Sequence, residues 1–144
     1  MGTLKERLKA NTKLLPEPGE IWLVSDKEIR LHTNNRQDKG ARPVLILQAE
    51  ELSSSKEIIV HVVPLTTASK PDRFIFPLDR AIEEWQDGIA PNLASCALIR
   101  FYQPIEEQFF RKRCGRIDER SYHAIRHILI THVIGNSNYD LEIP

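Results

Sequence analysis

The chain reads GARPVLILQ over residues 40–48, so that an arginine and a proline stand directly before an aliphatic run. Residues 44–48 are typical of the start of a buried strand, because they form a short and mostly apolar run. Arg42 therefore carries a permanent positive charge to the edge of the predicted core, and the ring of Pro43 restricts the backbone beside it. A charge in this position needs either a carboxylate partner or a functional reason.

Further β-rich runs lie on both sides of this strand. They are GEIWLV at residues 19–24, EIIVHVVPLTT at 57–67, RFIFPLD at 73–79 and ASCALIRFYQPIE at 94–106. Each is rich in β-branched or aromatic residues, which favour strands. We interpret residues 81–85, AIEEW, as a helical turn.

Residues 118–135, DERSYHAIRHILITHVIG, predict a C-terminal helix. Asp118 suits its N-cap position, and Gly135 suits its C-terminal stop. The expected buried stripe consists of Tyr122, Ile125, Ile128, Leu129, His132 and Val133. A short amphipathic helix is also expected over residues 3–15, which two following prolines end.

Several short strands with one strong helix predict an α+β fold, built as a small barrel or a twisted antiparallel sheet. At 144 residues a single domain is expected. We place this domain at residues 18–144 and interpret residues 1–17 as a helical extension packed on it.

The composition is that of an ordinary globular protein, with 41% hydrophobic and 28% charged residues. Lysine plus arginine equals aspartate plus glutamate at 20 each, so any attraction for nucleic acid must be local. Cys96 and Cys114 are too few and too far apart for a zinc or dithiol motif. Because neither a signal-peptide core nor a membrane-spanning run is recognisable, we expect a cytoplasmic protein with reduced thiols and no membrane association.

The order of the pieces resembles one known family. PGEIWLV is followed by a long polar loop at residues 25–41, then by ARPVLILQ, by VVPLTT and by a helix that ends in VIG. Long loops of this kind are often functional. The sequence from Pro18 to Gly135 thereby resembles the MazF/PemK family of toxin endoribonucleases, which belong to bacterial type II toxin–antitoxin pairs.

The resemblance implies a small SH3-like antiparallel β-barrel of the MazF/PemK/CcdB kind, with a C-terminal helix. It also implies a homodimer that cleaves single-stranded RNA at short sequences without a metal or other cofactor, an antitoxin partner, and operator DNA bound together with that antitoxin. Arg42 and Thr66 match the functional arginine and hydroxyl of the family. Candidates for RNA binding or support are Thr67, Ser69, Lys70, Gln37, Asp38, Lys39, Arg36 and His32.

RNA cleavage without a metal drives the 2′-hydroxyl onto the adjacent phosphorus, which requires proton transfers and stabilisation of charge on the phosphate oxygens. Arg42 suits charge stabilisation, since its guanidinium stays protonated and presents a planar fork, and it is unsuited to act as a general base. Thr66 can donate to a phosphate oxygen or accept from the 2′-hydroxyl. The structural alternatives are a strand-end Arg42 paired with a carboxylate and a Thr66 kept for β-propensity.

Histidine would be the natural proton carrier near neutral pH. His32 lies in the long loop, whereas His61 alternates with aliphatic residues along a strand and reads as structural. His123 and His127 stand one helical turn apart without the HExxH pattern or an acidic third ligand, so we expect no metal site. The alternative function is a non-catalytic barrel, either a gyrase-poison-like protein-binding toxin or a nucleic-acid-binding regulator; the presence of both Arg42 and Thr66 favours the enzyme.

Overall fold

The computed structural model describes residues 15–31, 40–51, 58–66, 74–78, 81–85 and 96–135. The strands are β1 (Glu20–Ser25), β2 (Ala41–Glu51), β3 (Ile58–Thr66), β4 (Ile75–Pro77), β5 (Ile82–Trp85), β6 (Cys96–Leu98), β7 (Gln103–Glu106) and β8 (Phe110–Ile117). The helical elements are the 3₁₀ turns η1 (Asp26–Glu28), η3 (Ile99–Phe101) and η4 (Glu107–Phe109), the α-helix α2 (Glu119–Ile128) and the π-helical segment η5 (Leu129–Ile134).

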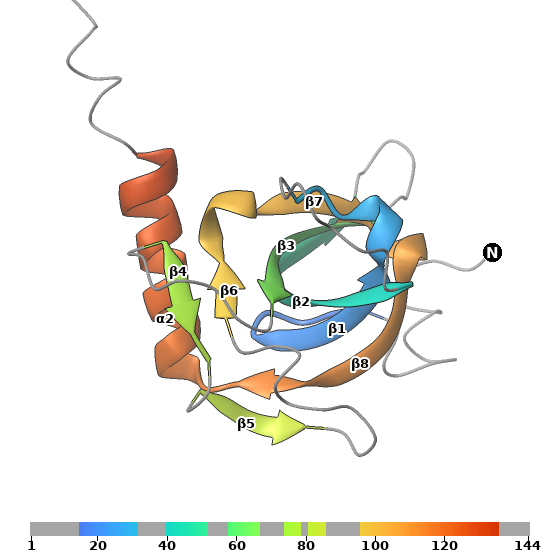
Figure 1. Ribbon diagram of the computed structural model, residues 1–144, viewed down its shortest axis with the longest axis horizontal. Coiled ribbons are helices and arrows are strands. Elements are labelled where there is room, and N and C mark those ends of the chain that lie inside the picture. The colour runs from blue at the N-terminus through green and yellow to red at the C-terminus, as the bar shows by residue number, and fades with distance from the viewer. Residues whose placement is uncertain are drawn as a thin grey trace, which may run out of the picture.

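The strands form one antiparallel sheet in the order β4-β6-β3-β2-β1-β8-β5, and β7 pairs with β3 outside this path. The sheet curves strongly, and α2 stands along one side of it (Figure 1). The expected combination of antiparallel strands and one C-terminal helix is therefore confirmed. The helix expected over residues 3–15 lies outside the described residues, apart from Leu15, which packs against the core.

Both faces of β2 are buried over residues 44–47, whereas Gln48, the last residue of the predicted run, is exposed. Leu45 and Leu47 face a core cluster that includes the buried side chains of α2. Val44 and Ile46 face a second cluster, built around Trp22 of β1. A strand between two apolar layers cannot alternate with polar residues, which explains the uninterrupted run in the sequence.

The C-terminal helix is capped and fastened to the sheet by hydrogen bonds. The Asp118 carboxylate accepts from the Ser121 backbone N–H at 2.6 Å, as an N-cap should. The Tyr122 hydroxyl donates to the Leu47 carbonyl oxygen at 2.7 Å. His132 is exposed, so its predicted place on the buried stripe is wrong. The reason is the change to π geometry from Leu129 onward, because a wider turn rotates later residues away from the α-helical stripe.

Two further interpretations of the sequence need correction. Residues 81–85 are not a helical turn: Ile82–Trp85 form strand β5, because they pair with β8 and their apolar members pack on the core. Gly115 permits that pairing, since a Cβ atom there would overlap the Glu84 carbonyl oxygen. The run at residues 94–106 contains two strands, β6 and β7, which the 3₁₀ turn η3 separates. Within the described part of the chain, no helix is long and apolar enough to cross a membrane.

We expect Tyr122→Phe to lower the free energy of unfolding by about 1 kcal/mol, because the buried Leu47 carbonyl loses its donor. Urea unfolding followed by circular dichroism measures the change. Tyr102→Phe is the control, since Tyr102 is 39% exposed and its substitution should be nearly neutral. Equal effects of the two substitutions would contradict the importance of this helix-to-sheet bond.

Candidate functional site

Arg42 is held in place by a buried carboxylate. Its Nε atom donates to Oδ1 of Asp26 at 2.8 Å, and the exposed fractions of the two residues are 8% and 1%. Asp26 opens η1 directly after β1, and its backbone N–H donates to the Gly40 carbonyl at 3.1 Å. The carboxylate partner that the sequence allowed for Arg42 is therefore present, supplied by the start of the β1–β2 connection.

Within the described residues, the Nε edge of this guanidinium is the one that has a hydrogen-bond partner. No other hydrogen bond joins Arg42 to any residue that the structure describes. Arg113, a second well-covered arginine, differs: it donates to Glu20 and, through two nitrogens at 2.9 and 3.0 Å, to Glu84. The hydrogen bond to Glu84 and the neighbouring Glu20 raise the pKa of Arg113 despite its burial. Arg113 is thus saturated by carboxylates, whereas no described residue accepts from the Nη atoms of Arg42.

Thr66 and Arg42 reach the same end of the β2–β3 ladder. Val44 pairs with Pro64; Arg42 stands two positions before Val44 on β2, and Thr66 stands two positions after Pro64 on β3. Residues two apart on a strand share a face, so both side chains project to the face that Val44 occupies. Thr66 is half-buried and pairs with Cys96 of β6. The strand register therefore places Arg42 and Thr66 at the same end of the β2–β3 ladder and on the same face of the sheet.

The remaining predicted site residues lie outside the described residues. They are His32, Arg36, Gln37, Asp38, Lys39, Thr67, Ser69 and Lys70.

The described histidines are engaged elsewhere. His61 lies opposite Gln48 and contacts Glu50 at 3.1 Å, several residues along β3 from Thr66. His123 contacts Glu119 at 3.4 Å on the exposed side of α2. Among the residues that the structure describes, no group of three or more His, Cys, Asp or Glu side chains could hold a metal ion.

Cys114 is not suited to nucleophilic chemistry. Burial raises the pKa of its thiol to about 11, and nearby Lys112 offsets this only in part. The thiol therefore stays protonated near neutral pH.

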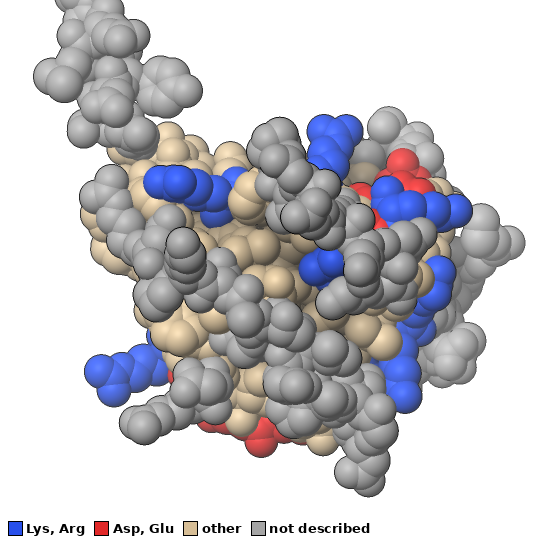
Figure 2. Space-filling model, viewed as in Figure 1, with Lys and Arg blue, Asp and Glu red and all other residues tan. Residues whose placement is uncertain are grey.

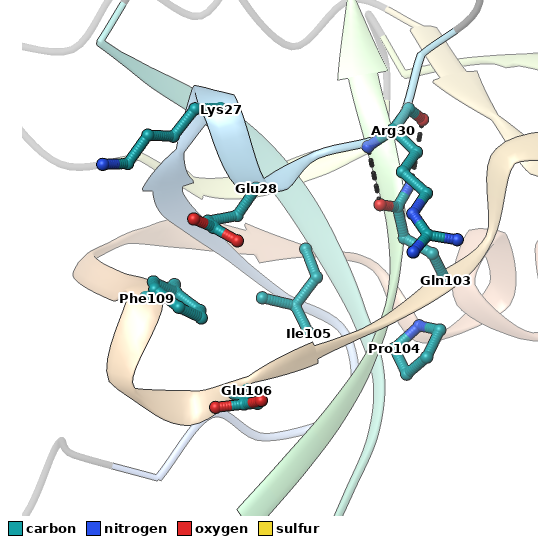
Figure 3. Close-up of a pocket in the computed structure, with 8 residues that line it drawn as sticks. All are labelled: Lys27, Glu28, Arg30, Gln103, Pro104, Ile105, Glu106 and Phe109. Atoms are coloured by element: carbon teal, nitrogen blue, oxygen red, sulfur yellow. Dashed lines mark hydrogen bonds between the residues drawn. The ribbon is translucent and has the colours of Figure 1, made fainter.

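A pocket of about 350 Å³ opens beside η1. It is lined by Lys27, Glu28, Arg30, Gln103, Pro104, Ile105, Glu106 and Phe109 (Figure 3). Gln103 closes one end: its amide oxygen accepts from the Arg30 N–H at 2.8 Å, and its amide nitrogen donates to the Arg30 carbonyl at 3.0 Å. Sequence reasoning missed Gln103, because no local pattern signals a partner 73 residues away.

Basic side chains gather on one edge of the molecule. Figure 2 shows lysine and arginine atoms along the edge that carries η4 and the start of β8 in Figure 1. Lys27, Arg111 and Lys112 are exposed, and Arg111 donates to the Ser25 hydroxyl, next to Asp26, at 3.0 Å. A neutral chain can thus still offer a local positive surface beside Arg42.

Comparison with known proteins identifies both a family and a fold. The family model described as PemK-like, MazF-like toxin of type II toxin–antitoxin system matches residues 17–133. No curated protein gives a significant match.

Three solved structures share the fold. An endoribonuclease in complex with its cognate antitoxin from Mycobacterial species has a TM-score of 0.55 and 16% identity, covering 85% of this chain and 97% of that one. MazE–MazF (Form-II) from Deinococcus radiodurans has a TM-score of 0.57 and 14% identity, covering 81% and 93%. An endoribonuclease from Mycobacterial species has a TM-score of 0.52 and 14% identity, covering 83% and 91%.

We expect Asp26→Asn to lower the free energy of unfolding by about 3 kcal/mol, because it leaves the buried Arg42 charge without its counter-ion. In a double-mutant cycle with Arg42→Gln, the coupling energy should exceed about 1 kcal/mol. Denaturant unfolding of the four proteins measures it.

The exposed pair of Glu119 and His123 provides the control cycle, with Glu119→Gln and His123→Gln. Its coupling should be below about 0.5 kcal/mol, since solvent screens exposed pairs. A cycle of Asp26 and Arg42 that is no larger than this control would show that the buried ion pair does not stabilise the site.

Proposed function

Because the chain belongs to the family of PemK-like, MazF-like toxins of type II toxin–antitoxin systems, we propose that it is an endoribonuclease that cuts single-stranded RNA at selected sequences without a metal. The observation that carries this proposal is the guanidinium of Arg42, which the buried Asp26 orients through Nε and whose Nη atoms bond to no residue that the structure describes. Solved structures of the same fold include endoribonucleases, which supports the assignment.

The proposed reaction is an attack of the RNA 2′-hydroxyl oxygen on the adjacent phosphorus. A bond forms between O2′ and phosphorus, the bond to O5′ breaks, and the products are a 2′,3′-cyclic phosphate and a 5′-hydroxyl. Negative charge builds on the non-bridging oxygens in the transition state, where a fixed guanidinium is most effective because it needs no reorientation. Arg42 supplies that charge, and Asp26 positions it.

Thr66 is proposed to orient the reacting groups. Its hydroxyl lies at the same end of the β2–β3 ladder as Arg42, and it can donate to a phosphate oxygen or accept from the 2′-hydroxyl. The proton from O2′ must pass to a base, and O5′ must receive one as it leaves. His32 remains the histidine candidate for one of these transfers, and Thr67, Ser69 and Lys70 remain candidates for contacts to the RNA.

The biological setting is part of the same proposal. We expect a homodimeric cytoplasmic toxin with a closed SH3-like barrel, which an antitoxin neutralises and which binds operator DNA together with that antitoxin. The similar solved structures include complexes with a cognate antitoxin and with MazE, which supports a protein partner of this type.

A non-catalytic binding barrel is the second candidate. The observation in its favour is that an arginine covered to this degree and paired with a carboxylate has a structural explanation of its own. It would act as a gyrase-poison-like toxin that binds a protein, or as a regulator that binds nucleic acid.

The decisive experiment incubates the purified protein with RNA of mixed sequence in excess EDTA. We expect wild type to cut the RNA, and Arg42→Ala to cut at least about a hundredfold more slowly, as expected when a donor to the transition-state charge is lost. Arg42→Lys should recover only part of the rate, because lysine keeps the charge without the planar fork. Thr66→Val should also slow cleavage while keeping the strand's β-branched packing.

Arg126→Ala is the matched control, since Arg126 is exposed on α2, and it should cut at the wild-type rate. Circular dichroism establishes that each variant is folded. Intact RNA after incubation with wild type, or equal rates for folded Arg42→Ala and wild type, would rule out the catalytic assignment in favour of the binding barrel.

A further inference from the structure

The pocket beside η1 combines an apolar wall with a charged rim. Ile105 is buried in its wall. Phe109 is half-buried and packs against the core cluster that contains Trp22. Lys27 and Arg30 are exposed at the rim, on the same connection that carries Asp26. The wall offers a flat surface to a planar group, and the rim offers positive charge.

The Glu28 carboxylate of this pocket has no partner among the described residues. It is half-buried, and its carboxylate faces Phe109 and Ile105 across the cavity (Figure 3). No hydrogen bond or ion pair links that carboxylate to another residue in the part of the chain that the structure describes. The other acid, Glu106, accepts from the Gln108 amide at 2.6 Å. Glu28 is thus an acceptor with two oxygens to offer a ligand.

These groups together select the chemistry of the ligand. An acidic peptide would satisfy Lys27 and Arg30 but would place its carboxylates against Glu28, and a basic peptide would meet the opposite conflict. A nucleotide satisfies both sets, because its phosphate suits the cations and its base can stack on Phe109. Among the bases, guanine presents two adjacent N–H donors, N1–H and the N2 amino group, which match the two oxygens of a carboxylate.

The pocket is within reach of an RNA strand bound at Arg42. Asp26, which pairs with Arg42, and Arg30, which lines the pocket, are four residues apart, so their separation is at most about 14 Å. The two hydrogen bonds between the Gln103 side-chain amide and the Arg30 backbone hold Arg30 against β7. One short segment therefore ties the pocket rigidly to the site.

We propose that this pocket is a guanine-binding subsite for the RNA strand, in which Glu28 reads the Watson–Crick edge of a base stacked on Phe109. The inference rests on the proposed ribonuclease function and adds a source of its sequence selectivity. A guanine near the cleaved bond would contribute to recognition without taking part in the chemical step.

The test measures binding of mononucleotides, which requires no cleavage. Guanosine 5′-monophosphate is titrated into ¹⁵N-labelled protein, and AMP, CMP, UMP and inosine 5′-monophosphate serve as comparisons. We expect GMP to bind wild type most tightly and to shift the side-chain amide resonances of Gln103. Inosine monophosphate, which lacks the N2 amino group, should bind more weakly. Glu28→Gln should weaken GMP binding about tenfold and remove the preference, consistent with the discrimination that a bidentate contact provides.

Two further variants complete the design. Glu83→Gln, a change at an exposed glutamate of β5, should keep the GMP preference. Phe109→Leu should weaken all five nucleotides together, because it removes the stacking surface. Equal affinity of wild type for the nucleotides, an unchanged preference in Glu28→Gln, or GMP-induced shifts confined to residues outside the pocket would overturn the proposal.

The nucleotide-binding test and the RNA-cleavage test can fail independently of each other. RNA left intact in EDTA, together with a GMP preference that depends on Glu28, would overturn the ribonuclease assignment and support a guanine-binding pocket. Cleaved RNA without any GMP preference would overturn the subsite alone. Loss of antitoxin binding in Glu28→Gln with an unchanged GMP preference would assign the pocket to a protein partner and so overturn the proposal.

Discussion

The buried ion pair between Asp26 and Arg42 is the constraint on which the site depends. Removing two charges from water costs several kcal/mol per ion, so such a pair persists only where the surrounding structure holds its geometry. Here two neighbouring strands hold it: Val24 of β1 pairs with Arg42 of β2, and Asp26 follows β1 directly. The positive φ of Gly40, 75°, and the hydrogen bond from Asp26 to its carbonyl bring the chain back into β2 beside its starting point.

The six residues from Asp26 to Leu31 connect the core, the site and the pocket. Asp26 pairs with Arg42, and Ile29 is buried in the core cluster that contains Trp22. The backbone of Arg30 is hydrogen-bonded to the Gln103 side chain. Movement of any one of these three residues would disturb the contacts of the other two. This rigidity is the physical basis for treating Arg42 as a preorganised charge and the pocket as a subsite at a set distance from it.

Several elements could be predicted from local patterns. Residues 44–47 are buried on both faces, Asp118 caps its helix, and the strand at residues 19–24 lies within one residue of β1. The failures involve partners that are distant along the chain. Residues 81–85 contain two glutamates and an isoleucine that a helix would accept equally well, and only pairing with β8 makes them a strand. His132 fits an α-helical stripe, which the π-helical end of the helix does not continue.

The sequence by itself determined the chemical groups that this protein can use. Arg42 beside a proline, Thr66 at the end of a β-rich run and the order of the pieces were sufficient to indicate a MazF/PemK-like chain. Only the tertiary structure decided which groups meet: Asp26 reaches Arg42 across 16 residues, and Gln103 reaches Arg30 across 73. Local patterns report backbone preference and burial, whereas contacts at such separations depend on how the strands pair, and pairing is a property of the whole sheet.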